Sequence, residues 1–174
     1  MVAQFLWRMK ILTILASIAL LVIPAQAQLS AVRLEVRPVA KTETSGKTHD
    51  TKNQSRALTI TLQNMSKVQM DDLVVKYWFF ARDEKSKDIH ILKAGERKST
   101  LAPSGKEEVE TEKVESTYTD KHTEVSNAKG KGKPTVKKVE ASGDKIAGHA
   151  VQVLQGGKII AENYSEPSFK DKAH

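Results

Sequence analysis

The chain has 174 residues, with 28 Lys and Arg, 21 Asp and Glu, five His and no Cys. Without cysteine it can form no disulfide and has no thiol chemistry, so its apolar core alone must hold the fold together. The positive surplus, +7 in formal charge, is small and does not cluster with aromatic residues, which argues against a nucleic-acid partner.

The first 27 residues predict a secretory signal peptide. A basic start is followed by an uninterrupted apolar run of 13 residues, 11–23, and Pro24 separates this run from an Ala-Gln-Ala sequence that ends at Ala27. This order is typical of an export leader, and we expect cleavage after Ala27. The alternatives are a retained membrane anchor and a prepilin-type leader. The run falls short of the roughly 20 residues that cross a bilayer, so no transmembrane segment is expected after cleavage.

Residues 28–174 are expected to form one domain located in the periplasm, at the cell surface or in the medium. Apolar and charged residues alternate over 29–39, which predicts a half-buried strand. Pro38 lacks a ladder donor, so this strand is expected at a sheet edge. Residues 40–55 are predicted to be a polar surface loop, and 56–64 a second strand.

The stretch 72–83 is the most apolar and most strand-prone segment after the leader, and we expect it at the centre of the core, covered on both faces. Alternation along a strand places its side chains on two faces. The two predicted faces consist of Leu73, Val75, Tyr77 and Phe79, and of Val74, Lys76, Trp78 and Phe80.

A short hairpin is predicted over 89–101, with its turn at 94–96. The polar segment 106–145 shows no helical periodicity, and we expect a projecting two-stranded hairpin or an insertion with its tip near 130–133. Its first part, 106–124, holds seven acidic residues and three Lys, whereas 129–138 holds five Lys and no acid. Antiparallel pairing of the two parts would place opposite charges across from each other.

The closing hairpin is predicted by two strands, 146–154 and 158–164, around Gly156 and Gly157, which supply the positive φ of a tight turn. This pairing places Val153 near Ile160 and Leu154 near Ile159. The polar tail, 166–174, is expected to be tethered by Phe169.

Seven to eight short strands and no helix after the leader predict an all-β, antiparallel β-sandwich. The chain resembles immunoglobulin-like domains in two features: Trp78 in the third strand and the closing sequence GHAVQVLQGGKIIAENYSEP. The resemblance covers about 29–169, without the paired cysteines of antibody domains. It extends to small exported domains of bacterial surface and pilus-associated proteins, which implies a structural or accessory role.

No catalytic, cofactor or metal site is predicted, and we do not expect an enzyme. No serine-nucleophile or phosphate-loop motif occurs, and the acidic residues lack the spacing of a calcium loop. The histidines are spread singly, without ligand spacing, and His149 is the one expected to be partly buried. They are His49, His90, His122, His149 and His174.

The candidate partner contacts lie in the polar segment, where lysines raise the local positive field and one aromatic residue is expected to be exposed. They are Tyr118, Lys129, Lys131, Lys133, Lys137 and Lys138. The sequence therefore predicts an exported, non-catalytic structural or accessory protein of a cell-surface or pilus-like assembly, which acts through protein contacts, either with a different protein or with a neighbouring copy of itself. The alternative is an extracellular module that binds a metal or a glycan, in particular an anionic one.

Overall fold

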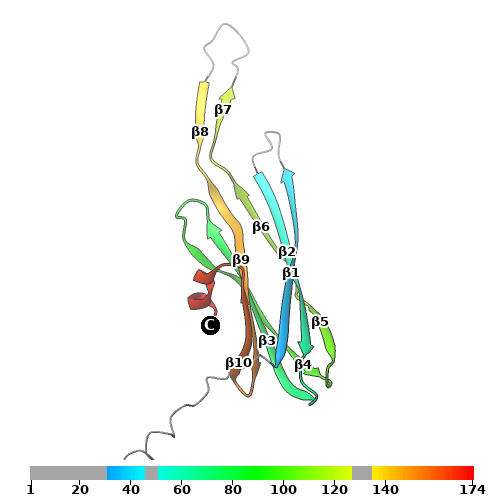
Figure 1. Cartoon of the computed structure of the whole chain (residues 1–174). Coiled ribbons are helices and arrows are strands. Elements are labelled where there is room, and N and C mark those ends of the chain that lie inside the picture. Colours follow the sequence, from blue (N-terminus) through cyan, green and yellow to red (C-terminus); the bar gives the residue numbers. More distant parts are fainter. Residues whose placement is uncertain (1–30, 46–50, 127–134) are drawn as a thin grey trace, which may run out of the picture.

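The computed structural model describes residues 31–45, 51–126 and 135–174 (Figure 1). These residues form ten strands and one short 3-10 helix, so the predicted all-β fold is confirmed. The elements are β1 (Val32–Ser45), β2 (Thr51–Asn64), β3 (Met70–Asp83), β4 (Ile89–Leu101), β5 (Lys106–Glu110), β6 (Val114–Thr119), β7 (His122–Ser126), β8 (Thr135–Val139), β9 (Ser142–Gln155), β10 (Lys158–Tyr164) and η1 (Pro167–Lys172). Within the described ranges, no helix has the length and apolar character needed to cross a membrane.

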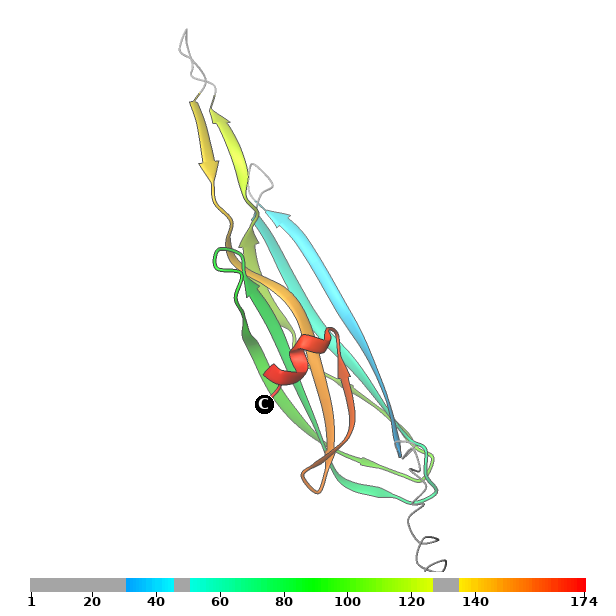
Figure 2. The same cartoon turned by 60° about the vertical axis from the view of Figure 1, so that its left-hand side comes forward.

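The strands form an antiparallel sandwich of two layers. One layer contains β1, β2, β5 and β6, and the other contains β4, β3, β9 and β10 in that order. β5 and β6 pair with successive halves of β2, so they act as one interrupted strand. The layers are hydrogen-bonded to each other at one end, where β6 pairs with the start of β9. Figures 1 and 2 show the resulting elongated body.

The connectivity is immunoglobulin-like. β3 pairs with β9, and β9 pairs with β10, as the third, sixth and seventh strands of such domains do. The opposite layer starts from β1 and β2 and continues with the β5–β6 strand. β7 and β8 lie in the connection between β6 and β9 and form a separate two-stranded sheet. β1 lies at a sheet edge, as Pro38 predicts.

The core between the layers consists of alternate side chains from facing strands. The inner face of β3 is the predicted one, and its side chains are fully or nearly fully buried against β2 and β9. The main members of this cluster are Leu58, Ile60, Leu62, Leu73, Val75, Tyr77, Phe79, Val151 and Val153. Burying each such side chain contributes roughly 1.5–3 kcal/mol, so this cluster is the main source of stability.

The outer face of β3 is buried at Trp78 and Phe80, beneath the C-terminal tail, and half-buried at Val74 and Lys76. The Phe169 ring of η1 stacks on Phe80, with 4.4 Å between the ring centroids and 10° between the planes. Trp78, Ala150 and Ala173 complete this second apolar cluster. Trp78 is thus buried, as the resemblance implies, but on the outer face of its sheet and not between the layers. The predicted tether by Phe169 is confirmed.

Glycine allows the tail to lie close to the sheet. A Cβ on Gly148 would collide with the ring of Phe169 and with the hydroxyl of Ser165. The Ser165 hydroxyl accepts a hydrogen bond from the backbone N–H of His149 at 2.8 Å, and the Ser165 N–H donates to the His149 carbonyl at 3.0 Å. The tail is therefore fixed to β9 before Phe169 reaches Phe80.

Two predicted connections are strands in the structure. The prediction of a loop over 40–55 is wrong, because β1 and β2 stay paired as far as Ser45 and Thr51. Residues 46–50 lie outside the described residues. The prediction of a hairpin over 89–101 is also wrong, since β4 is one continuous strand over this range. Gly95, expected in the turn, lies opposite Tyr77 in mid-strand, where a Cβ would collide with the tyrosine ring.

The closing hairpin is confirmed, with one change of register. Leu154 pairs with Ile159 as predicted, but a bulge after Ile159 brings Ala161 opposite Val153 in place of Ile160. Gly156 and Gly157 both have positive φ, 56° and 78°, as the predicted tight turn requires.

Replacing Phe169 by alanine should test how strongly the tail contributes to the fold. We expect Phe169→Ala to lower the free energy of unfolding by about 3–5 kcal/mol, because a fully buried ring is replaced by a cavity over Phe80. Urea denaturation, followed by the fluorescence of Trp78, measures the change. Val39→Ala on an exposed position of β1 is the control and should change the value by less than about 0.5 kcal/mol. Equal stability of the two variants would contradict the role given to the tail.

Candidate partner-binding arm

The hairpin β7–β8, called the arm here, extends beyond the end of the sandwich (Figures 1 and 2). The chain enters the arm from β6 and leaves it into β9, so both arm strands continue from paired strands of the body. The predicted projecting hairpin is thus confirmed, but over a shorter range than 106–145. β5 and β6, which lie within that range, belong to the sandwich because they pair with β2.

The root of the arm is a fixed contact between the two layers. Tyr118 pairs with Gly143, and Thr119 pairs with Ser142. The Ser116 hydroxyl donates to the carbonyl of Asp144. Gly143 has a φ of 85°, and a Cβ there would collide with the carbonyl of Thr117. Glycine is therefore required where the chain returns from the arm, because it combines a left-handed backbone with a close approach to β6.

The prediction that Tyr118 is exposed is wrong. Its side chain lies at the root of the arm with 4% exposure, beneath two lysine side chains. The ammonium groups of Lys52 and Lys145 lie 5.6 Å and 5.2 Å from the centre of its ring, which is a cation–π geometry. Burial follows from alternation: Val114 and Tyr118 face inward on β6, and this period of two was a signal in the sequence.

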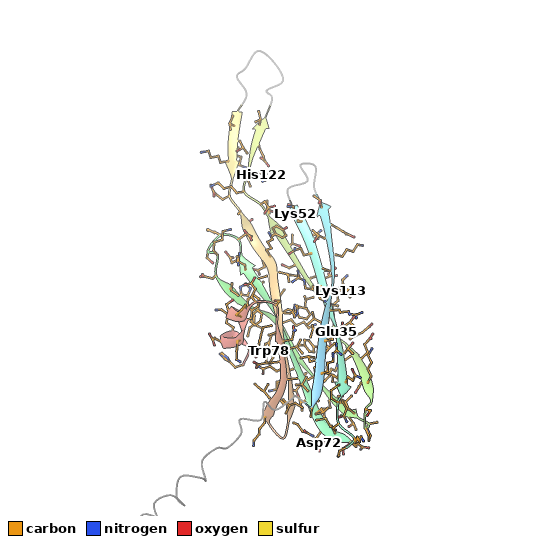
Figure 3. All side chains as sticks on the ribbon, viewed as in Figure 1. Glu35, Lys52, Asp72, Trp78, Lys113 and His122 are labelled. Atoms are coloured by element: carbon orange, nitrogen blue, oxygen red, sulfur yellow. The ribbon has the colours of Figure 1, made fainter. Side chains whose placement is uncertain are left out.

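An ion pair connects the root to β2. The Nζ of Lys52 lies 2.6 Å from Oδ2 of Asp120, the residue that follows β6. The hydrogen bond from Lys52 lowers the pKa of Asp120 and raises the pKa of Lys52. Both side chains are partly exposed, so the pair adds little stability but limits how the arm can swing away from β2. Figure 3 shows Lys52 and His122 close to this root.

The two faces of the arm differ in character. Cross-strand register places Thr123 opposite Lys138, and Val125 opposite Val136. The two valines are 59% and 60% exposed, so they form an apolar pair open to solvent. The other face includes Glu124, opposite Lys137, which is the one pairing of opposite charges in the described arm. The broader prediction, that the acids of 106–124 lie across from the lysines, is wrong because most of these acids lie on β5 and β6.

The arm strands have open edges in the described structure. β7 and β8 pair only with each other, and no other described strand pairs with either. Backbone N–H and C=O groups on the outer edges are thus available to an added strand. Of the predicted contact lysines, Lys137 and Lys138 are exposed on β8. Lys129, Lys131 and Lys133 lie outside the described residues.

The outer face of the β1–β2 layer is polar. Small side chains along β2 form its floor, and charged side chains of β1, β5 and β6 form its walls. Two depressions on it have volumes of about 320 and 330 Å³; their linings include Lys41, Asn53 and Thr117 in the first, and Arg33, Thr61 and Lys106 in the second. All aromatic rings of the described residues are buried or half-buried, so this face presents no stacking platform for a sugar.

His149 is buried, as expected. It lies on β9 opposite Phe79, on the same face as Val151, so its ring points between the layers. Its Nδ1 atom has no hydrogen-bond partner in the described structure. Burial lowers the pKa of His149, and the positive charge of Arg56 lowers it further, against a smaller opposite effect of Asn163. Across the described ranges, no three His, Asp or Glu side chains gather as metal ligands would.

No family model matches the chain, and no curated protein matches it. Two solved structures are similar to it at low identity. A target of the Northeast Structural Genomics Consortium is 12% identical with a TM-score of 0.32, over 65% of this chain and 85% of that one. A crystal structure from Akkermansia muciniphila is 18% identical with a TM-score of 0.36, over 78% of this chain and 70% of that one. At these values neither likeness carries an argument about function.

The depressed pKa of His149 predicts that the protein is less stable in acid. In the unfolded chain histidine takes up a proton near pH 6.5, whereas the buried ring resists protonation, so the unfolded state binds more protons as pH falls below that value. The free energy of unfolding should therefore fall between pH 7.5 and 5, by at most about 1.4 kcal/mol per pH unit below 6.5.

Urea denaturation of the native chain and of His149→Gln at several pH values measures this effect. The unfolding free energy of the native chain minus that of the variant should decrease as the pH falls. Taking this difference cancels the contribution of the carboxylates, which both proteins share. Val39→Ala, at an exposed position without a titrating group, is the control and should leave the pH dependence of the native chain unchanged. A His149→Gln variant with the native pH dependence would show that His149 is not responsible.

Proposed function

We propose that this chain is an exported, non-catalytic structural or accessory protein of a cell-surface assembly and that the arm is its point of contact with a protein partner. The observation that supports this most is the solvent-exposed pair Val125 and Val136 on a two-stranded arm with open edges. The arm is rooted in both layers of the sandwich through β6 and β9, so it presents these groups at a defined place.

The physics of an isolated hairpin favours a contact role. Two strands with no further partner are marginally stable in water, because they bury little apolar surface for the backbone entropy lost. The arm leaves two β-branched side chains in solvent and its strand edges unpaired. A partner strand added to the arm would pair its open edge, as in β-augmentation, and a partner that covers the valines would remove them from water.

Export and the lack of catalysis are the other parts of the proposal. The leader over residues 1–27 supports export. The placement of the buried histidine supports a non-catalytic role, because His149 faces the apolar core and lines none of the depressions described above. A nucleophile or general base needs access to a substrate, which this position does not give.

Export can be tested on the full-length chain expressed in a bacterium. The periplasmic fraction should contain a chain that begins at Gln28, because the Ala-Gln-Ala sequence meets the requirement for small residues before the cut. Mass spectrometry of the intact chain measures the start. Ala27→Lys is the matched variant and should leave the leader uncut. A native chain that stays in the cytoplasm at its full length would contradict export.

The contact role of the arm can be tested by photo-crosslinking in expressing cells. A benzophenone amino acid at Val136 should give adducts of higher mass, because that position lies in the proposed contact, and mass spectrometry identifies the attached protein. The same amino acid at Glu96, exposed on β4 of the body, is the matched control and should give none.

Replacement of 121–140 by Asn-Gly should preserve the fold, since Thr119 and Ser142 are paired just inside the cut. A crosslinker at Asp120, beside the root, should give adducts in the chain with its arm and none in the variant without the arm. Absence of any adduct at Val136 would contradict the contact role.

A further inference from the structure

A second exposed apolar pair lies in the connection between β2 and β3, called the base loop here (65–69). Met65 is 59% exposed, and Val68 is 71% exposed. Of the seven large apolar side chains that are exposed in the described residues, four belong to this pair and to the valine pair of the arm. The pairs come from different parts of the chain, and each is open to solvent.

The base loop is held in one conformation by a buried side chain. Asn64 is 1% exposed, and its Nδ2 donates to the carbonyls of Val68 at 2.7 Å and Ala102 at 3.0 Å. Its Oδ1 accepts from the N–H of Ser66 at 2.8 Å and from its hydroxyl at 2.7 Å. Met65 donates its N–H to the carbonyl of Ala31 at 2.8 Å. The loop is therefore preorganised with two apolar side chains pointing outward, which lowers the entropy lost on binding.

The two pairs lie at opposite ends of an elongated body. β2 begins at Thr51, which pairs with Thr119 at the root of the arm, and ends at Asn64, which leads into the base loop. Figure 3 shows this separation, with His122 at the root of the arm and Asp72, shortly after the base loop, at the far end. A contact between the two pairs of one molecule is thus excluded by the length of β2.

The charges beside the two pairs are complementary. The arm bears Lys137 and Lys138, both exposed. Asp71 and Asp72 follow the base loop, and both are exposed. The register between β3 and β4 shifts between Met70 and Leu73, and Asp72 has a φ of 53°. The two aspartates therefore lie outside the regular pairing of β3 with β4. The Asp71 carboxylate accepts a hydrogen bond from the Gln69 side chain at 2.7 Å. Lys67 and Lys98 offset part of the acidic charge, and Glu107, which lines the same depression as Asp72 and Lys98, adds to it.

We infer that the arm of one copy docks on the base loop of a second copy, so that the chain assembles head to tail. Val125 and Val136 would pack on Met65 and Val68, with Lys138, which lies on the valine face of the arm, beside the two aspartates. Because the two surfaces are different and lie at opposite ends, a docked pair of copies still has one free arm and one free base loop, and the contact repeats into an open filament. This inference rests on the proposed contact role of the arm and adds the identity of the partner.

The test uses two polar variants that preserve shape and strand propensity. The arm variant is Val125→Thr with Val136→Thr, and the base variant is Met65→Gln with Val68→Thr. In sedimentation velocity, the native chain without its leader should form species larger than dimers as its concentration rises. Each variant alone should remain monomeric, with self-association weakened at least ten-fold. Ile91→Thr, at an exposed apolar position on β4, is the control and should assemble like the native chain.

Mixing the two variants provides the decisive result. The arm variant keeps an intact base loop, and the base variant keeps an intact arm. In an equimolar mixture the intact arm should dock on the intact base loop, which gives dimers and nothing larger. A mixture that stays monomeric, or a base variant that assembles like the native chain, would overturn the head-to-tail contact. A native chain that remains monomeric at every concentration would overturn it too.

The crosslinking experiment separates this inference from the proposed function. Adducts at Val136 that contain a second copy joined at the base loop support both. Adducts that contain a different protein leave the contact role of the arm standing and overturn the head-to-tail inference. If Val136 gives no adduct of any kind, both fail.

Discussion

The structure depends on the burial of β3 on both of its faces. Phe79 faces the layer formed by β1 and β2, and Phe80 faces the tail, where it stacks on Phe169. A sheet in a two-layer sandwich normally leaves its outer face to water, so polar residues would be expected there. Here the tail covers the part of that face around Trp78 and Phe80 and makes it a second core. The strand can therefore carry consecutive aromatic residues without exposing any of them.

This arrangement has a consequence for the shape of the molecule. Two apolar clusters hold β3 and β9 from Ile146 on, so the start of β9, just before Ile146, has a defined place at one end of the body. β6 is hydrogen-bonded to that point, and Gly143 allows the close approach. The arm therefore emerges from the end where both layers are joined. Its direction is set by backbone pairing, and a few lysine contacts at Tyr118 and Asp120 add to it.

The sequence predicts those parts of the fold in which apolar residues recur every second position. The two faces of β3 follow from such a pattern and are present in the structure. The closing hairpin follows from its two central glycines, and the tether follows from Phe169 as an apolar residue in a polar tail; both are present as well. The extension of β1 and β2 beyond the core does not follow. Residues 41–44 and 51–55 are polar on both faces, and backbone pairing holds them as strands, together with polar side-chain contacts such as that of Lys52 with Asp120. Such pairing leaves no trace in hydropathy.

The candidate site was predicted in its place but not in its details. A polar hairpin before the last two strands was expected, and it projects from the body as the arm. Its apolar pair is not evident in the sequence, because ten mainly polar residues separate Val125 from Val136 and the two meet only through the register of β7 and β8. The lysines of the same segment dominate its composition, so the sequence predicts a contact through charge and not through apolar side chains.

An exposed valine pair carries little information by itself, since single apolar side chains are common on protein surfaces. The inference becomes specific through the constraints on both partners of the contact. The arm is rooted at the junction of the layers, and the base loop is fixed by Asn64. Each surface is thus preorganised, and β2 spans the distance between them. A contact between two such surfaces repeats with a fixed orientation, which is the geometric requirement for a regular filament.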